Sequence, residues 1–229
     1  MQRVSLIIPT YNEAKNMPIL VEEIFNIVDK DKIDLELIIV DDNSPDGTGQ
    51  VAEELSRKFP IQVVHRAGKL GLGSAVREGF SRSQRQYLGV MDADLSHDPK
   101  ALNQMIFFLS EYEIVFASRF ETGSVVEQWK WWRRLISQLG VCLTYILTGV
   151  KDPLSGYFFF RRQVIDNVSL NTTGYKILLE ILVKGHYQKI KEVPFRFRIR
   201  KFSTSKLEGK EYWLFLKQII EYSLYKLFK

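Results

Sequence analysis

Apolar runs alternate with amphipathic segments along the first half of the chain. The runs are nearly continuous in Val, Ile, Leu, Phe and Met, as in strands buried on both faces. They cover residues 4–9, 35–40, 61–65, 87–91 and 113–118. Segments typical of helices follow the first four runs, at residues 17–28, 49–59, 73–83 and 99–110. This alternation predicts an α/β fold, with a mostly parallel sheet and helices on both of its faces.

Two helix starts carry local signals. The side chain of Asn16 is placed to cap the first helix, and Pro18 falls in the first turn of that helix. Asp98 and Pro99 mark the start of the fourth helix in the same way.

Polar clusters follow three of the predicted strands. They are the "TYNE" segment with Tyr11 and Glu13, the pair Asp41–Asp42, and the segment Asp92–Asp94. Ligands of parallel α/β sheets bind beyond the carboxyl ends of the strands. We therefore expect the functional site at this edge of the sheet.

Asp92 and Asp94 give the strongest chemical signal. Two like charges this close repel each other unless a cation lies between them. Residues two apart in an extended segment point the same way, so both carboxylates are expected in one cleft. There they can hold Mg²⁺ or Mn²⁺ together with phosphate oxygens and water. The alternative is a helix cap, which we favour for Asp98 but not for Asp94.

Other motifs do not match known sites. The segment "GKLGLGSA" (residues 68–75) lacks the third glycine of a dinucleotide fingerprint and the Lys-Ser/Thr ending of a P-loop. It is predicted to be a tight turn between a strand and a helix. His65, His97 and His186 have no metal-ligand spacing and are predicted to be structural or on the surface. His97 alone lies close enough to the acidic pair to take part in the site.

Length and composition limit the class of protein. The chain has 229 residues, of which 45% are hydrophobic, which fits a single globular domain over residues 1–229. Cys142 is the only cysteine, so no internal disulfide forms, as in a reducing compartment. The first strand begins too early for a signal peptide to precede it. No apolar stretch reaches the roughly 18 residues of a membrane span.

Seven motifs occur in one order along nearly the whole chain. They are "VSLIIPTYNE", "IIVDDNSPDGT", "LGLGSAVREGF", "VMDADLSHDP", "ASRF", "KDPLSGY" and "GYKILLEILVKG…EVPFRF…SKL". Together they resemble glycosyltransferase family 2, which has the GT-A fold. "GYKILLEI" and the terminal "SKL" are similar to the lipid-phosphate branch, the dolichyl-phosphate (polyprenol monophospho-) mannose synthases.

The resemblance implies inverting transfer of mannose from GDP-mannose to polyprenyl (dolichyl) phosphate, with Mg²⁺ or Mn²⁺ as cofactor. The nucleotide-sugar site that it implies comprises Pro9, Tyr11, Glu13, Val40, Asp42, Asp92, Ala93, Asp94, Ser96, Arg200 and Lys206. Asp92 and Asp94 would be the metal ligands. Ser96 stands where family members often have Gln, so water is the alternative third ligand.

The acceptor side is implied in the same way. The residues expected at the acceptor phosphate are Arg119, Arg133 and Ser137, and those expected to be catalytic are Asp94, Arg119, Arg133 and Arg200. The family usually has Gly at Ser203 and Thr at Leu154. The second pKa of a phosphate monoester is about 6, so the acceptor is already ionised at neutral pH and needs no general base.

Two segments, about residues 129–149 and 209–229, combine aromatic, aliphatic and basic residues. Such helices lie in a membrane interface; the alternative is that they pack on the domain, with Trp129, Trp131 and Trp132 in its core. With a lipid acceptor, they predict a peripheral protein on the cytoplasmic face of a membrane. A membrane-anchoring subunit or transmembrane region is a further candidate partner, and we expect no nucleic acid.

Two other functions stay open at this point. One is transfer of another nucleotide sugar, of the UDP-glucose type, to a lipid phosphate or a glycan. The other is a non-catalytic module that binds nucleotide sugars at a membrane surface. The acidic pair argues against the second, and the basic residues favour a phosphate acceptor over a glycan.

Overall fold

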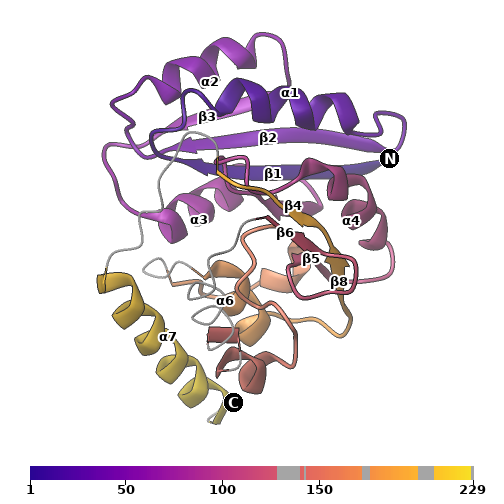
Figure 1. Cartoon of the computed structure of the whole chain (residues 1–229), viewed down its shortest axis with the longest axis vertical. Coiled ribbons are helices and arrows are strands. Elements are labelled where there is room, and N and C mark those ends of the chain that lie inside the picture. Colours follow the sequence, from indigo (N-terminus) through magenta and orange to yellow (C-terminus); the bar gives the residue numbers. More distant parts are fainter. Residues whose placement is uncertain (128–139, 142, 172–175, 201–208, 228–229) are drawn as a thin grey trace.

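The computed structural model describes residues 1–127, 140, 141, 143–171, 176–200 and 209–227 (Figure 1). In this part of the chain the main sheet has the strand order β3-β2-β1-β4-β7-β5-β8. Its strands are β1 (Gln2–Thr10), β2 (Ile33–Asp41), β3 (Ile61–His65), β4 (Tyr87–Val90), β5 (Ile114–Ser118), β7 (Phe158–Arg161) and β8 (Ile190–Pro194). A short parallel pair, β6 (Val125–Val126) and β9 (Arg196–Phe197), forms a second sheet.

Helices follow most of the strands. The α-helices are α1 (Met17–Ile27), α2 (Thr48–Ser56), α3 (Leu72–Arg82), α4 (Leu102–Phe108), α6 (Ile177–Lys184) and α7 (Gly209–Leu227). The 3₁₀ turns are η1 (Pro99–Ala101) and η2 (Arg162–Ile165). Residues 140, 141 and 143–148 are also helical.

The strands bury alternate side chains on opposite faces of the sheet. Leu6 and Ile8 of β1 pack in the core beneath α1, α2 and α4, whereas Ile7 packs in the core beneath α3 and α6. Figure 1 shows α1 and α2 on one side of β1 and β2, and α3 on the other. The continuous apolar runs are therefore explained by a sheet that is covered on both faces.

The predicted fold class is confirmed, and all five predicted strands are present. The sheet departs from a fully parallel arrangement at one strand, β7, which pairs antiparallel with both β4 and β5. Neither β7 nor β8 was among the predicted strands.

The predicted cap of the first helix is wrong. Asn16 occupies the N-cap position of α1, but its side chain makes no capping hydrogen bond; the amide instead donates to Glu13 Oε2 at 2.5 Å.

The strand directions bring the functional segments to one edge. The strands β1, β2, β4, β5 and β8 all end at the same edge because they run parallel to one another. Since β7 runs the opposite way, it begins there. The preceding "KDPLSGY" segment, residues 151–157, therefore joins the polar clusters that follow β1, β2 and β4.

A third apolar cluster joins α6, α7 and the helical residues 140, 141 and 143–148. It contains Leu147, Leu179, Val183 and Tyr222. Lys226 of α7 donates from its ammonium group to the backbone carbonyl of Leu147, which fixes the two helices together. None of the described helices is long and apolar enough to cross a bilayer.

Candidate active site

The acidic pair lies in a bend directly after β4. The chain leaves the sheet at Val90, and Leu95 takes a left-handed backbone conformation with φ of 64°. Asp94 Oδ1 accepts hydrogen bonds from the backbone N–H of Ser96 at 3.0 Å and from its hydroxyl at 2.5 Å. Asp94 Oδ2 lies 2.6 Å from Nε of Arg200. The expectation of an extended Asp-Ala-Asp segment was therefore wrong, since the bend sets the two side chains.

The Asp92 carboxylate keeps more of its surface open. Its side chain is 32% exposed, against 8% for Asp94. Burial raises the pKa of Asp92, and the charge of Asp94 raises it further, while His97, Arg200 and Lys176 act in the opposite direction. The two carboxylates therefore repel each other across a short distance, as the sequence predicted.

Three cations from separate segments face this pair. Arg200 follows β9 and pairs with Asp94, Lys176 precedes α6, and Arg119 follows β5. The charges of Lys176 and Arg200 favour the ionised form of Asp92 and thus act against the rise in its pKa. The cluster thus holds alternating charges that suit a ligand with several phosphate oxygens.

Arg119 is fixed by Asp152 of the "KDPLSGY" segment. Its Nε and Nη2 donate to the two carboxylate oxygens at 2.8 and 2.7 Å, and its backbone N–H donates at 2.9 Å. Burial acts to lower the pKa of Arg119, but Asp152 and, less strongly, Asp92 outweigh it, so the shift is upward. The guanidinium is thus held charged and in one orientation near the acidic pair.

The predicted nucleotide residues meet at the ends of β1 and β2. Pro9 and Val40 are direct partners in the parallel register. Lys69, from the glycine-rich turn, places its ammonium group 4.3 Å from the centre of the Tyr11 ring. The backbone N–H of Glu13 donates to the hydroxyl of Thr48 at 2.9 Å, which ties the first loop to α2.

Asp42 is buried in an ion pair that the sequence did not indicate. Its Oδ1 accepts from Nη1 of Arg66, and its Oδ2 accepts from the backbone N–H of Gly71 at 2.9 Å. Gly71 has φ of 97°, a conformation that favours glycine. The glycine-rich segment is therefore the predicted tight turn, and it is also clamped to the second strand end.

The remaining predicted residues take defined places. Ala93 and Ser96 are buried beside the acidic pair. Asp98 caps η1 by accepting from the backbone N–H of Lys100 at 3.0 Å, which confirms the helix cap predicted for it. Arg133, Ser137 and Lys206 lie outside the described residues, as do Ser203 and the tryptophans Trp129, Trp131 and Trp132.

The residues present fit a hard divalent cation. Two neighbouring carboxylates, one of them partly open, match the protein's usual share of a Mg²⁺ or Mn²⁺ site, with water and phosphate as the other ligands. Gly156 lies against Asp92, and a Cβ at that position would come within 3.0 Å of Oδ2. The space in front of the carboxylate thus depends on glycine. No cluster of three His, Cys, Asp or Glu ligands was found among the described residues.

Sequence reasoning missed four residues of this region: Arg66, Asp152, Gly156 and Lys176. Three of them lie in motifs that were recognised: Asp152 and Gly156 in "KDPLSGY", and Lys176 in "GYKILLEI". Their contacts join segments far apart in the chain, so no local spacing pointed to them. For Arg66, its position directly after the third strand was the available signal.

The chain matches a known family and curated relatives. The model of "Glycosyl transferase family 2" matches residues 5–169. A dolichol-phosphate mannosyltransferase of Pyrococcus furiosus is 42% identical over 95% of this chain, which spans 62% of that relative's length. A dolichol-phosphate mannosyltransferase of Saccharomyces cerevisiae is 33% identical over 97% of this chain and 87% of the relative.

Solved structures share the fold. Glucosyl-3-phosphoglycerate synthase from Mycobacterium tuberculosis, in complex with Mn²⁺, UDP-glucose and phosphoglyceric acid, aligns over 97% of this chain and 79% of its own, with TM-score 0.70 and 18% identity. A mannosyltransferase from Pyrobaculum calidifontis, in complex with GDP-Man and Mn²⁺, aligns over 96% of this chain and 64% of its own, with TM-score 0.64 and 19% identity. At these identities the likeness establishes the fold.

Proposed function

Because this chain belongs to glycosyl transferase family 2, we propose that it transfers mannose from GDP-mannose to the phosphate of a polyprenol such as dolichol. An oxygen of the acceptor phosphate forms a bond to the anomeric carbon, the bond from that carbon to the diphosphate breaks, and GDP leaves. Attack opposite to the leaving group inverts the configuration. Residues 1–229 act as one catalytic domain in this proposal.

The observation that carries the proposal is the acidic pair facing Arg119, Lys176 and Arg200. Two anions, the donor diphosphate and the acceptor phosphate, must enter one cleft. A protein that binds both needs fixed positive charge on each side of the reacting carbon. The names of the curated relatives support the transferred sugar and the acceptor class, and the mannosyltransferase structure with GDP-Man supports the donor.

On the donor side, Asp92 and Asp94 are the residues that would hold Mg²⁺ or Mn²⁺. When bound, such an ion neutralises the negative charge that develops on the leaving diphosphate. Pro9, Tyr11, Glu13, Val40 and Asp42 lie at the ends of the first two strands, where the nucleoside would bind. Ser96 orients Asp94 through its hydroxyl. Arg200 and Lys206 would contact the donor phosphates.

On the acceptor side, Arg119 would contact the lipid phosphate together with Arg133 and Ser137. Arg119 is held by Asp152, so little side-chain motion is lost when the phosphate binds. The acceptor is ionised at neutral pH and needs no base. The protein residues orient the acceptor phosphate and offset its repulsion from the donor diphosphate.

The lipid acceptor requires contact with a membrane surface. Leu143, Tyr145 and Ile146 in the helical residues 143–148 are exposed, as are Ile220, Leu224 and Leu227 of α7. We propose that the segments 129–149 and 209–229 lie in the membrane interface, on the cytoplasmic face. A membrane-anchoring partner or segment remains a prediction.

The proposal is tested with radiolabelled GDP-mannose and a short polyprenyl phosphate in detergent, with Mn²⁺ or with EDTA. Metal-dependent label in the lipid phase, with none from UDP-glucose in parallel, is the expected result. Label from UDP-glucose alone would keep the reaction type and replace the donor. Nucleotide binding without transfer from either donor would favour the non-catalytic alternative.

A further inference from the structure

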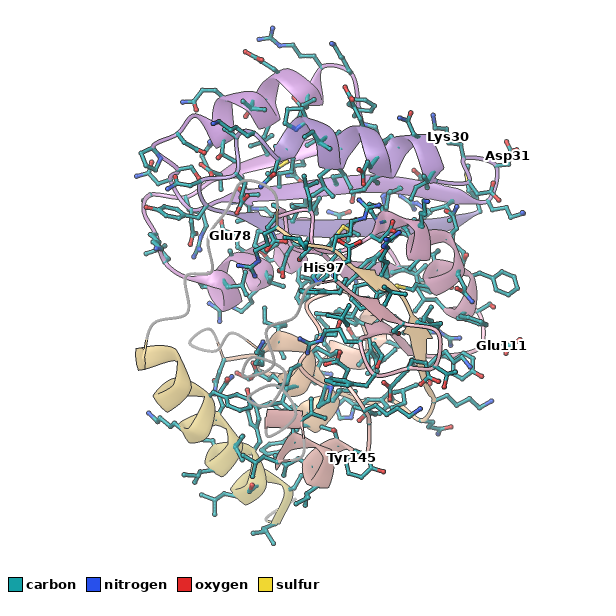
Figure 2. All side chains as sticks on the ribbon, viewed as in Figure 1. Lys30, Asp31, Glu78, His97, Glu111 and Tyr145 are labelled. Atoms are coloured by element: carbon teal, nitrogen blue, oxygen red, sulfur yellow. The ribbon has the colours of Figure 1, made fainter. Side chains whose placement is uncertain are left out.

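His97 lies beneath the acidic pair in a closed aromatic environment. Its side chain is only 4% exposed, and its ring stacks on Tyr157 with centroids 5.5 Å apart. The rings of Phe195 and Phe197 lie 5.9 Å away. Figure 2 shows His97 near the centre of the molecule, whereas Asp31 lies at its rim. No step of the proposed reaction uses this imidazole.

The hydrogen bonding of the ring fixes its tautomer. The backbone N–H of Asp92 donates to Nδ1 of His97 at 3.3 Å. Since a backbone amide can only donate, Nδ1 carries no proton. An imidazole always carries at least one ring proton, so Nε2 is protonated. Nε2 lies 4.0 Å from Oδ2 of Asp92.

The imidazole of His97 thus lies next to Asp92 at two points. Its Nδ1 accepts from the backbone N–H of Asp92, and its Nε2 lies near the Asp92 carboxylate. Gly156 lies against both groups: a Cβ there would lie 3.0 Å from Oδ2 of Asp92 and 3.2 Å from Cε1 of His97. The close packing of the carboxylate and the ring therefore depends on glycine at this position. Partners of this kind around a ligating carboxylate or imidazole set its orientation and affect metal affinity.

We infer that His97 is a positioning residue, which presents the Asp92 carboxylate to the divalent cation through its Nε2–H. The inference rests on the proposed function, in which Asp92 is a metal ligand. His97 touches neither substrate nor metal in this assignment. Its contribution is to hold one ligand in place before the ion and the nucleotide arrive.

Two substitutions separate this role from packing. The amide nitrogen of Gln reaches the place of Nε2, so His97→Gln keeps a donor toward the Asp92 carboxylate. The amide oxygen of Asn reaches the place of Nδ1, so His97→Asn keeps the acceptor for the backbone N–H but loses that donor. Both variants lose the aromatic ring and its stack on Tyr157.

The measurement is the affinity for GDP by calorimetry, in saturating Mn²⁺ and in EDTA. The ratio of the two affinities reports the metal site, and the EDTA value reports the base pocket. We expect His97→Asn to lower the ratio by about 10- to 100-fold and His97→Gln to lower it only a few-fold, with GDP affinity in EDTA unchanged.

Equal losses in both variants would overturn the inference and assign the ring to packing alone. Ratios that match the wild type in both would also overturn it, while the metal site stands. If the wild type binds GDP equally well in Mn²⁺ and in EDTA, the proposed function does not involve a metal, and the role of His97 is excluded as well. Urea unfolding of each variant shows how much stability the lost stack contributes.

Discussion

Asp92 and Asp94 differ in how much of their hydrogen-bonding capacity is already used inside the protein. Asp94 is engaged at both oxygens, by Ser96 and by Arg200. Asp92 has a backbone bond to His97 but an open carboxylate. Of the two, Asp92 is therefore the carboxylate that would hold a cation without losing an ion pair. Arg200, beside Asp94, would contact a donor phosphate from the same place.

Asp92→Asn and Asp94→Asn are each expected to lower mannosyl transfer by at least about 100-fold, since charge stabilisation by a bound metal amounts to several kcal/mol. The Asn side chain keeps an acceptor for Ser96, so the fold is expected to survive. Initial rates with radiolabelled donor measure the transfer, and circular dichroism shows whether the fold is kept. Asp31→Asn, on an exposed residue at the rim, is the control. Near-wild-type turnover in either site variant contradicts the metal assignment.

Glu192 on β8 predicts a pH dependence of stability. Its Oε2 is buried and finds no hydrogen-bond partner among the described residues. Burial raises the pKa of Glu192 above the ordinary value of 4.5. Folding therefore favours the protonated carboxyl, and the stability that it contributes is fully present below that ordinary pKa and lost as pH rises through the raised one.

Glu192→Gln should remove this loss. Urea unfolding at about pH 4 and pH 7 gives the change in free energy of unfolding for each protein. We expect the wild type to lose more stability, or gain less, over this interval than the variant does. The comparison uses the difference in slope, so a constant cost of the substitution does not affect it. Parallel pH profiles would show that Glu192 titrates normally.

Single residues show where sequence reasoning holds and where it stops. Asp98 caps the following turn as its position indicated, because a cap involves only neighbours in the chain. Asn16 has the right position but donates to Glu13 instead, a competing bond that the spacing does not reveal. Arg66 and Lys176 reach the site from distant segments, so only the folded chain brings them there.

Among the elements, the pairing of β4 with β7 supports the acidic segment. Gly89 and Phe159 are register partners across this antiparallel pair. A Cβ at Gly89 would lie 2.3 Å from the Phe159 ring and 3.1 Å from Leu6. The Phe159 ring fills the space over this glycine, in the strand that leads to Asp92.

Gly89→Ala should therefore destabilise the protein by about 1–3 kcal/mol through overpacking. This loss is expected even though alanine loses less backbone entropy on folding than glycine does. Gly68→Ala is the matched control, since nothing lies within 4 Å of its added Cβ. Combining Gly89→Ala with Phe159→Leu should cost less than the sum of the single changes. Strict additivity, measured by urea unfolding, would show that the ring is not the obstacle.

The elements of the first half were predictable because each strand and helix carries its own apolar pattern. β7 was not, although "FFF" is as apolar as the other strands. Its place between β4 and β5 depends on which strands it meets after a long connection. The chain order places β4 before β5, so their separation by a later strand cannot be found from spacing.

At the scale of the whole molecule, more than half of the exposed large apolar residues among those described lie on two helices that pack together in the third cluster. In Figure 1, α7 lies apart from β1 and β2, along the side of the molecule that carries α6. Ile146 is 83% exposed on the neighbouring helix. The sequence predicted both segments as interfacial, and this stays a prediction; the apolar side chains exposed among their described residues are consistent with it.

Ile146→Ser should weaken binding to vesicles of phosphatidylcholine and phosphatidylserine by about 10- to 100-fold, since one buried Ile side chain contributes roughly 1.5–3 kcal/mol. Phe107→Ser on α4, where the side chain is 63% exposed, is the control and should change little. Sedimentation with vesicles measures both. Equal losses in the two variants would show that the membrane contact is not specific to this helix.

The position of β7 also bears on how the chain is made. Among the described strands of the main sheet, β5 pairs with β7 and β8 alone, and both are synthesised after it. The strands β1 to β4 can assemble as soon as they leave the ribosome, whereas β5, buried along its whole length in the finished protein, must wait without a neighbour. During that interval the edge of β4 and the whole of β5 are open to other chains. Nascent chains arrested before Phe158 are therefore expected to be the stage most dependent on chaperones.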